Sequence, residues 1–260
     1  VPVAAPSANL SGRPSCTSAQ DVLEDMDGRI EGVVDGGPCV VGVESTILDL
    51  TCEPPRLLRP GGLPVEELER LIGPIAVDRA VIGTLAEGEK PKAPGMKYRH
   101  YAPKAPVTVV TGAPAKSAQE IKRRVGVHSG VICFDEYVRL FPDQVVHAIG
   151  PVEDKLAQAQ RVFEALRTFD NSPVTEIYTQ CPDGRGLGLA VGNRLKKAAG
   201  FHVVEADSEK IILGLTGGTG AGKSSALAVL RKLGAVVLDC DQVYHQMLAE
   251  DEEMQKEVSR

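Results

Sequence analysis

The sequence predicts an α/β protein, because segments with strand character alternate with segments of helical character along most of its 260 residues. Between residues 106 and 207, β-branched runs follow one another with helical patterns between them. A further predicted strand at 210–215 and a predicted helix at 225–233 enclose a glycine-rich loop. Alternation of this kind is typical of a mostly parallel sheet covered by helices.

The composition narrows the class of protein further. The chain is 43% apolar and 25% charged, as is ordinary for a globular protein, and its net charge of −6 argues against indiscriminate binding to nucleic acid. No apolar run approaches the roughly 18 residues of a membrane span. The six cysteines form no C-x-x-C pair. We therefore expect a cytoplasmic protein with reduced thiols, no zinc site and no membrane association.

Residues 1–90 form the first predicted unit, in which short strands are separated by turns. An apolar strand begins at Val1 and ends in the turn PSANLSG. Thr17 and Gln20 form a capping box for a helix, and Pro64 begins a second helix. Further strands are expected at 33–34, 41–50 and 56–59.

A basic segment bounded by prolines, residues 91–105, is the predicted linker, and it contains APGMKYRHYAP. Proline disfavours helix in the residue before it, so we expect an extended segment. Side chains alternate in an extended chain, and Lys97, Arg99 and Tyr101 would then face one way, offering two cations and a phenol to phosphate and base. Taken alone, the segment is more typical of a solvated linker.

Residues 106–207 form the second predicted unit. Strands are expected at 107–110, 130–134, 145–149 and 176–180. Three helices are expected. The first begins at a capping box formed by Ser117 and Glu120 and ends near Arg124, and the others span 154–169 and 187–199. The glycines at 184–188 do not complete a dinucleotide-binding fingerprint, because Leu189 stands in place of its third glycine, and we interpret them as a turn.

Residues 208–260 form the third predicted unit, in which GGTGAGKS fits the phosphate-loop pattern G-x-x-x-x-G-K-[ST] in full. Between a strand and a helix, such a loop directs backbone N–H groups at phosphate. The phosphate-binding residues predicted here are Gly217, Gly220, Gly222, Lys223 and Ser224. A strand at 235–238 would carry Asp239 and Asp241 to the same edge of the sheet, where carboxylates serve as a general base or in a magnesium shell.

Four motifs in order, PSANLSG, GVESTILDL, LLRPGG and APGMKYRHYAP, resemble the threonylcarbamoyl-AMP synthase family in its two-domain form, and GRGLGLAVGNRLKKAAG resembles the end of the appended domain. The resemblance implies a twisted-sheet catalytic domain followed by a Rossmann-like parallel α/β domain. The family's Lys-x-Arg strands precede the SAN turn and are not in this sequence. We therefore expect a truncated catalytic domain, poor ATP binding and no turnover by this chain alone.

The resemblance implies that L-threonine and bicarbonate form a carbamate, which attacks the α-phosphate of ATP with Mg²⁺ present and gives threonylcarbamoyl-AMP and pyrophosphate. The threonylcarbamoyl group of the product is later passed to adenosine 37 of tRNA. By position in the motifs, the backbone of Ala5 and the side chain of Ser45 would lie at L-threonine. The residues implied at ATP are Ser7, Asn9, Ser15, Arg59 and Tyr101, with Lys97, Arg99 and His100 closing over them.

The segment LGLTGGTGAGKSSALAVLRKLGAVVLDCDQVYH resembles the amino-terminal part of dephospho-coenzyme A kinase. This implies Asp241 as the base for the ribose 3′-hydroxyl, and Ser224 and Asp239 at Mg²⁺. We therefore expect a fragment of a fused or misjoined gene product whose main identity is the synthase. Two alternatives stay open: a kinase that phosphorylates dephospho-coenzyme A, and a non-enzymatic tRNA-binding module made of the Lys90–Lys104 spacer and the Arg185–Lys197 helix.

Overall fold

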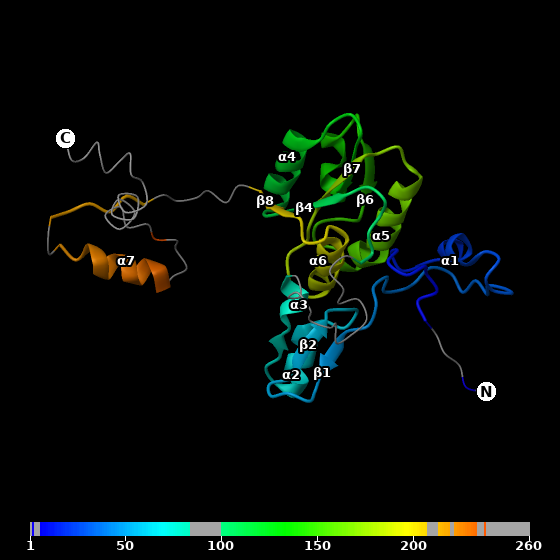
Figure 1. Cartoon of the computed structure of the whole chain (residues 1–260), viewed down its shortest axis with the longest axis horizontal. Coiled ribbons are helices and arrows are strands. Elements are labelled where there is room, and N and C mark those ends of the chain that lie inside the picture. The colour runs from blue at the N-terminus through cyan, green and yellow to red at the C-terminus, as the bar shows by residue number, and fades with distance from the viewer. Residues whose placement is uncertain are drawn as a thin grey trace, which may run out of the picture. The chain divides into compact units, whose positions relative to one another are not determined.

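The computed structural model describes residues 2, 6–83, 100–206, 213–218, 221–232 and 237. The chain divides into two compact units, Val1–Ser208 and Glu209–Arg260. The first unit contains a large parallel sheet and a small mixed sheet, each with its own helices (Figure 1). The prediction of an α/β protein is therefore confirmed at the level of fold class.

The large sheet has five strands in the order β6-β5-β7-β4-β8, and every pair of neighbours is parallel. The strands are β4 (Val107–Thr111), β5 (Ser129–Cys133), β6 (Val145–Ala148), β7 (Glu176–Gln180) and β8 (Val203–Glu205). Because β7 lies between β4 and β5, the strand order differs from the usual Rossmann order 3-2-1-4-5.

Helices cover both faces of this sheet (Figure 1). The helical elements are α4 (Pro114–Arg124), the 3₁₀ helix η1 (Asp135–Leu140), α5 (Lys155–Thr168), η2 (Phe169–Asn171) and α6 (Leu187–Ala198). Val109 packs with residues of α5 and α6, whereas its neighbour Val110 packs with Ile121 of α4 on the opposite face. The β-branched runs therefore bury both of their faces, as parallel strands between helices do.

Two helices of this domain, α5 and α4, begin in different ways. Asp154 caps α5, and its side chain accepts a hydrogen bond from the Ala157 N–H group, as the predicted boundary requires. The predicted capping box at Ser117 is wrong, because α4 already begins at Pro114 and the Ser117 hydroxyl donates to the Pro114 carbonyl within the helix. Proline fits the first turn of a helix because its missing N–H group is not needed there.

The small mixed sheet contains β1 (Ile47–Asp49), β2 (Arg56–Arg59) and β3 (Ala76–Val77). Strand β2 pairs antiparallel with β1 and parallel with β3. Its helices are α2 (Val65–Ile72), which follows Pro64, and α3 (Arg79–Ile82). The strand predicted at 41–50 is thus limited to its end, and the preceding residues form a loop.

The N-cap of helix α1 (Ala19–Met26) lies one residue later in the chain than the predicted Thr17. Ser18 is the N-cap, and Asp21 supplies the reciprocal side chain. The strand predicted at 33–34 is wrong, because the chain is irregular there and Val34 is 98% exposed. Two β-branched residues do not make a strand where no neighbouring strand pairs with them.

The second unit contains helix α7 (Lys223–Lys232), directly after the glycine-rich loop. The described end of the strand predicted at 210–215 is irregular, and its beginning lies outside the described residues. Of the strand predicted at 235–238, only Val237 is described. Among the helices that the structure describes, none has the length and apolar character needed to cross a bilayer.

Candidate functional site

A polar cluster, here called the Glu44 cluster, lies between the small sheet and α6. Its members are Ser15, Glu44, Ser45, Arg59, Tyr101 and Arg194. The Ser15 hydroxyl donates to one carboxylate oxygen of Glu44 at 2.7 Å, and Arg194 Nε donates to the other at 2.7 Å. Arg59 donates from Nε to the Ser45 carbonyl at 3.1 Å and from Nη2 to the Ser45 hydroxyl at 3.3 Å. Four residues predicted at L-threonine or ATP are thereby brought together.

Tyr101 forms the closed side of this cluster and is 1% exposed. Its ring centre lies 5.1 Å from that of Phe163 and 5.5 Å from the Arg194 guanidinium carbon. Its φ of 63° is uncommon for a residue with a side chain, so the surrounding contacts must hold it. The next residue, Ala102, donates from its N–H group to the Gly12 carbonyl at 3.3 Å, which ties the PSANLSG turn to Tyr101.

The charges of the cluster keep Glu44 ionised. Burial on its own would raise the pKa of Glu44, but the Arg194 charge and the hydrogen bonds from Ser15 and Arg194 outweigh it and lower this pKa from 4.5 to about 2. Burial raises the pKa of Tyr101 to about 12, against the opposing effect of Arg194. At neutral pH the cluster therefore holds one carboxylate, two guanidinium groups and a neutral phenol.

The low pKa of Glu44 predicts a loss of stability in acid. Because the pKa is lowered on folding, the contribution is complete above pH 4.5 and disappears as the pH falls towards 2. A shift of this size corresponds to about 3 kcal/mol. Urea unfolding of the wild type and of Glu44→Gln at several pH values between 7 and 2.5 measures it. We expect the gap between the two free energies of unfolding to shrink below pH 4.5. A gap that stays constant with pH would contradict the assignment.

The LLRPGG motif explains how Glu44 and Ser45 are held in place. A Cβ on Gly61 would lie closer than 3.0 Å to the backbone of Glu44, Ser45 and Thr46, so only glycine allows this approach. Gly62 donates from its N–H group to the Glu44 carbonyl at 2.9 Å. The end of β2 is thereby fixed against the loop that carries Glu44 and Ser45.

The other predicted synthase residues are placed differently. Ser7 is exposed. The Asn9 side chain donates to the carbonyls of Leu10 at 2.9 Å and Arg13 at 3.1 Å, so it stabilises its own turn. His100 packs edge-on against Tyr101, with ring centres 4.1 Å apart. Ala5, Lys97 and Arg99 lie outside the described residues.

In the second unit, the glycine-rich loop that is predicted to bind phosphate is described in part. Gly217 and Gly222 have φ values of 153° and 80°, which suit glycine, and Ser224 lies in the first turn of α7. The Lys223 ammonium donates to the carbonyls of Gly217 and Gly218. Gly220, Asp239 and Asp241 lie outside the described residues. No group of three His, Cys, Asp or Glu side chains suited to a metal ion occurs within the described part of the chain.

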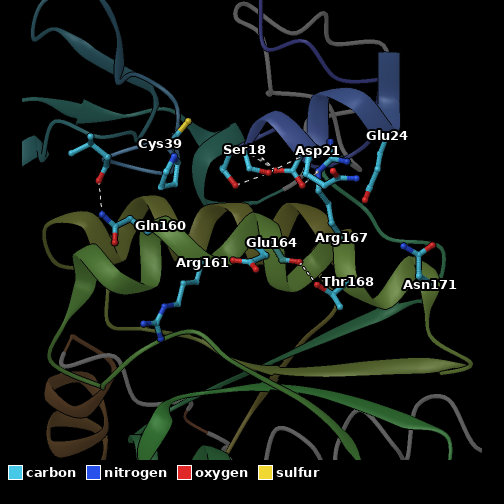
Figure 2. Close-up of a pocket in the computed structure, with 14 residues that line it drawn as sticks. Ser18, Asp21, Glu24, Cys39, Gln160, Arg161, Glu164, Arg167, Thr168 and Asn171 are labelled. Carbon is cyan, nitrogen blue, oxygen red and sulfur yellow. Dashed lines mark hydrogen bonds and ion pairs between the residues drawn. The ribbon is translucent and has the colours of Figure 1, made fainter. Parts of the chain in front are cut away.

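Several hollows occur in the described part of the first unit. One, of about 510 Å³, is lined by Glu44, Ser45 and apolar side chains of β1, α2 and the connecting loops, so it opens onto the exposed edge of the Glu44 cluster. Another, of about 780 Å³, lies between α1 and α5 (Figure 2). Figure 2 shows Arg167 reaching from α5 towards α1, whereas Arg161 points away. No residue predicted from the sequence as a binding residue lines this second hollow.

The sequence prediction missed Glu44 and Arg194 as members of the cluster. The helical spacing of α6 does indicate that Arg194 is on the buried face. Arg194 lies three residues after Val191 and four before Ala198, and both of these residues are buried. Arg194 and Lys197 are buried, not solvated, so α6 cannot present them to tRNA as a basic face. Burial, followed by the charge of Arg194, lowers the pKa of Lys197 to about 8.

Comparison with protein families assigns most of the chain. Residues 63–200, more than half of it, match the family described as "Threonylcarbamoyl-AMP synthase, C-terminal domain". This chain belongs to the threonylcarbamoyl-AMP synthase family. Residues 1–61 match a family described as "Telomere recombination", and residues 211–260 match the family described as "Dephospho-CoA kinase". Both resemblances inferred from the sequence motifs are confirmed.

Individual synthases agree with this membership. The chain is 47% identical over 210 residues to the threonylcarbamoyl-AMP synthase of Pyrococcus abyssi and 44% identical over 206 residues to that of Bacillus subtilis. The crystal structure of Pyrococcus abyssi Sua5 with L-threonine matches with a TM-score of 0.70 at 44% identity. Each match covers 78% of this chain and 59% of the synthase, so the chain spans somewhat more than half the length of these relatives.

Proposed function

We propose that the first unit takes part in L-threonylcarbamoyladenylate synthesis, in which L-threonine, bicarbonate and ATP give threonylcarbamoyl-AMP, pyrophosphate and water. The observation that carries the proposal is that Ser15, Ser45, Arg59 and Tyr101 share one cluster although they lie far apart in the sequence. The Pyrococcus abyssi relative, whose crystal structure contains L-threonine, supports the choice of amino acid. The product would serve formation of N6-threonylcarbamoyladenosine at position 37 of tRNA.

Each residue has a physical role in this proposal. Ser45 is exposed at the 510 Å³ hollow, where its hydroxyl can bind the carboxylate or hydroxyl of L-threonine. Arg59 carries a planar cation suited to phosphate, and the neutral Tyr101 carries a hydroxyl and a ring. Both are buried, at 9% and 1% exposure, so the nucleotide would have to displace contacts that now cover them. Ser7 and Asn9, on the turn beside Tyr101, would face the nucleotide, and Ala5 would contact L-threonine. The family chemistry uses MgATP, whose phosphate oxygens supply ligands that Mg²⁺ prefers.

We propose the following division of the chain. Residues 1–90 form the synthase part, 91–105 the linker, 106–207 the appended Rossmann-like domain and 208–260 the phosphate-loop unit of a kinase. Poor ATP binding and lack of turnover by this chain alone stay predictions, and an assay of threonylcarbamoyl-AMP formation from L-threonine, bicarbonate and MgATP tests them.

Calorimetric titration of the chain with L-threonine and with MgATP tests the proposed function. Ser45→Ala should weaken L-threonine binding, and Arg59→Ala should weaken MgATP binding, each by about tenfold or more, because each removes a hydrogen bond in the site. Arg56→Ala is the matched control, since Arg56 lies on the same strand with a partly exposed side chain that faces Asp78 at 3.8 Å. Equal effects of Arg56→Ala and Arg59→Ala would contradict the proposed site.

The second candidate function is a P-loop kinase acting on dephospho-coenzyme A, with Asp241 as base and Mg²⁺ held at Ser224 and Asp239. The match of residues 211–260 to the kinase family favours it, as does the position of Lys223 at the start of α7. If ATP binds there, Lys223→Ala removes its affinity and Arg59→Ala does not. The opposite pattern assigns ATP to the synthase site.

A further inference from the structure

Arg194 is the largest fully buried side chain of the described chain, and its exposed fraction is 0%. It lies on α6, among the helices of the parallel sheet, whereas the residues assigned to L-threonine and ATP come from the part of the chain before residue 102. A buried guanidinium is costly unless its N–H groups find partners. The partners of Arg194 therefore indicate what the side chain does.

Arg194 is bound on one side by its own helix and on the other by Glu44. Its Nη1 donates to Asn193 Oδ1 at 3.0 Å, and Asn193 in turn donates to the Val81 carbonyl at 2.9 Å. Its Nε donates to Glu44 at 2.7 Å. Asn193 thus fixes the guanidinium, and the guanidinium then fixes one oxygen of the carboxylate.

The other carboxylate oxygen of Glu44 connects Arg194 to the residues of the candidate site. It accepts the hydrogen bond from Ser15, and Glu44 directly precedes Ser45 in the chain. The guanidinium also faces the ring of Tyr101 at 5.5 Å, within the range of a cation–π contact. One arginine of α6 is therefore connected to three residues assigned to substrates.

We propose that Arg194 is a positioning residue of the synthase site, through which α6 orients the Ser15 hydroxyl by way of Glu44 and supports Tyr101. The inference rests on the proposed function and assigns the appended domain a part in nucleotide binding. Because Ser15 and Tyr101 touch the Arg194–Glu44 pair while Ser45 is bound by Arg59, loss of Arg194 should weaken MgATP binding more than L-threonine binding.

A mutant cycle tests the inference by measuring MgATP affinity and the free energy of unfolding for each protein. Every protein of the cycle carries Lys223→Ala, so that the second unit does not contribute to the MgATP affinity. Arg194→Met should lower MgATP affinity by about tenfold or more, because it removes the charge-assisted hydrogen bond that holds Glu44. Arg194→Lys keeps the positive charge and should therefore retain part of the wild-type MgATP affinity. The double variant Glu44→Gln/Arg194→Met removes both charges, so it should regain stability relative to Arg194→Met. Its MgATP affinity should nevertheless stay low, because Ser15 still lacks its ionised partner.

The control is Arg161→Met, which removes an arginine of α5 that is half exposed and 3.9 Å from Asp135. It should leave MgATP affinity unchanged. The inference is overturned if Arg194→Met binds MgATP like the wild type, or if affinity recovers together with stability in the double variant. If the wild-type chain binds neither MgATP nor L-threonine, the proposed function fails and the inference fails with it.

Discussion

Replacing Asp25 with asparagine is expected to lower the free energy of unfolding by about 3–5 kcal/mol, the cost of breaking a buried ion pair. The Asp25 carboxylate has 0% side-chain exposure and accepts hydrogen bonds from Arg167 at 2.9 and 3.2 Å, from Arg13 at 2.6 Å and from the Leu10 N–H group at 3.0 Å. Asparagine keeps the volume but removes the carboxylate that binds Arg167 most closely, and Asp21, 3.9 Å from Arg167 Nε, is then the remaining carboxylate beside it. Urea unfolding at neutral pH measures the loss.

The matched control for this prediction is Glu120→Gln. Glu120 also pairs with two arginines, Arg123 at 2.7 Å and Arg124 at 2.6 Å, but these two side chains are 60% and 42% exposed. Exposed pairs contribute about 0–1 kcal/mol, so this variant should remain close to the wild type. Similar losses for Asp25→Asn and Glu120→Gln would show that the Asp25 pair does not hold α1 to α5.

Substituting Gly42 with alanine is expected to cost about 2–5 kcal/mol from two effects. Gly42 has a φ of 82°, where a side chain costs about 1–2 kcal/mol. A Cβ there would also lie closer than 3.0 Å to the α5 backbone at Ala159 and Gln160, and overpacking of this kind costs about 1–3 kcal/mol. Because the Gly42 loop leads into Glu44, the variant should also bind L-threonine more weakly.

Gly73→Ala separates these two effects. Gly73 has nearly the same φ, 83°, but nothing lies within 4 Å of the position of its Cβ. Only the backbone conformation contributes there, and its ψ of −167° lies in a region that is essentially confined to glycine, so we expect a loss of about 1–3 kcal/mol. If urea unfolding gives equal losses for both variants, the close approach of Gly42 to α5 has no energetic consequence.

The parts of the fold that follow from local pattern were predictable from the sequence. The helical stripe from Asp154 to Phe169 became α5, and the run Glu176–Gln180 is β7 as predicted. Predictions were wrong where a short sequence pattern was overridden by neighbouring residues or by the lack of a pairing strand. Ser117 resembles an N-cap, but Pro114 starts the helix earlier, and the pair at 33–34 has no strand to pair with.

The candidate site was predictable only in part. Motif resemblance indicated Ser15, Ser45, Arg59 and Tyr101, but nothing local indicates that Glu44 joins them to a helix 150 residues away. A charged residue on a helix is usually solvated, whereas Arg194 is buried with Glu44 and Asn193 as the partners of Nε and Nη1. Its partner depends on tertiary packing, which spacing along one helix does not contain.

The most direct test of the candidate site is a crystal structure of this chain grown with L-threonine and a non-hydrolysable MgATP analogue. We expect L-threonine in the 510 Å³ hollow against Ser45, and the nucleotide against Ser15, Arg59 and Tyr101. L-threonine and nucleotide bound elsewhere, with the Glu44 cluster unchanged and out of contact with both, would contradict the assignment of this cluster to the synthase site.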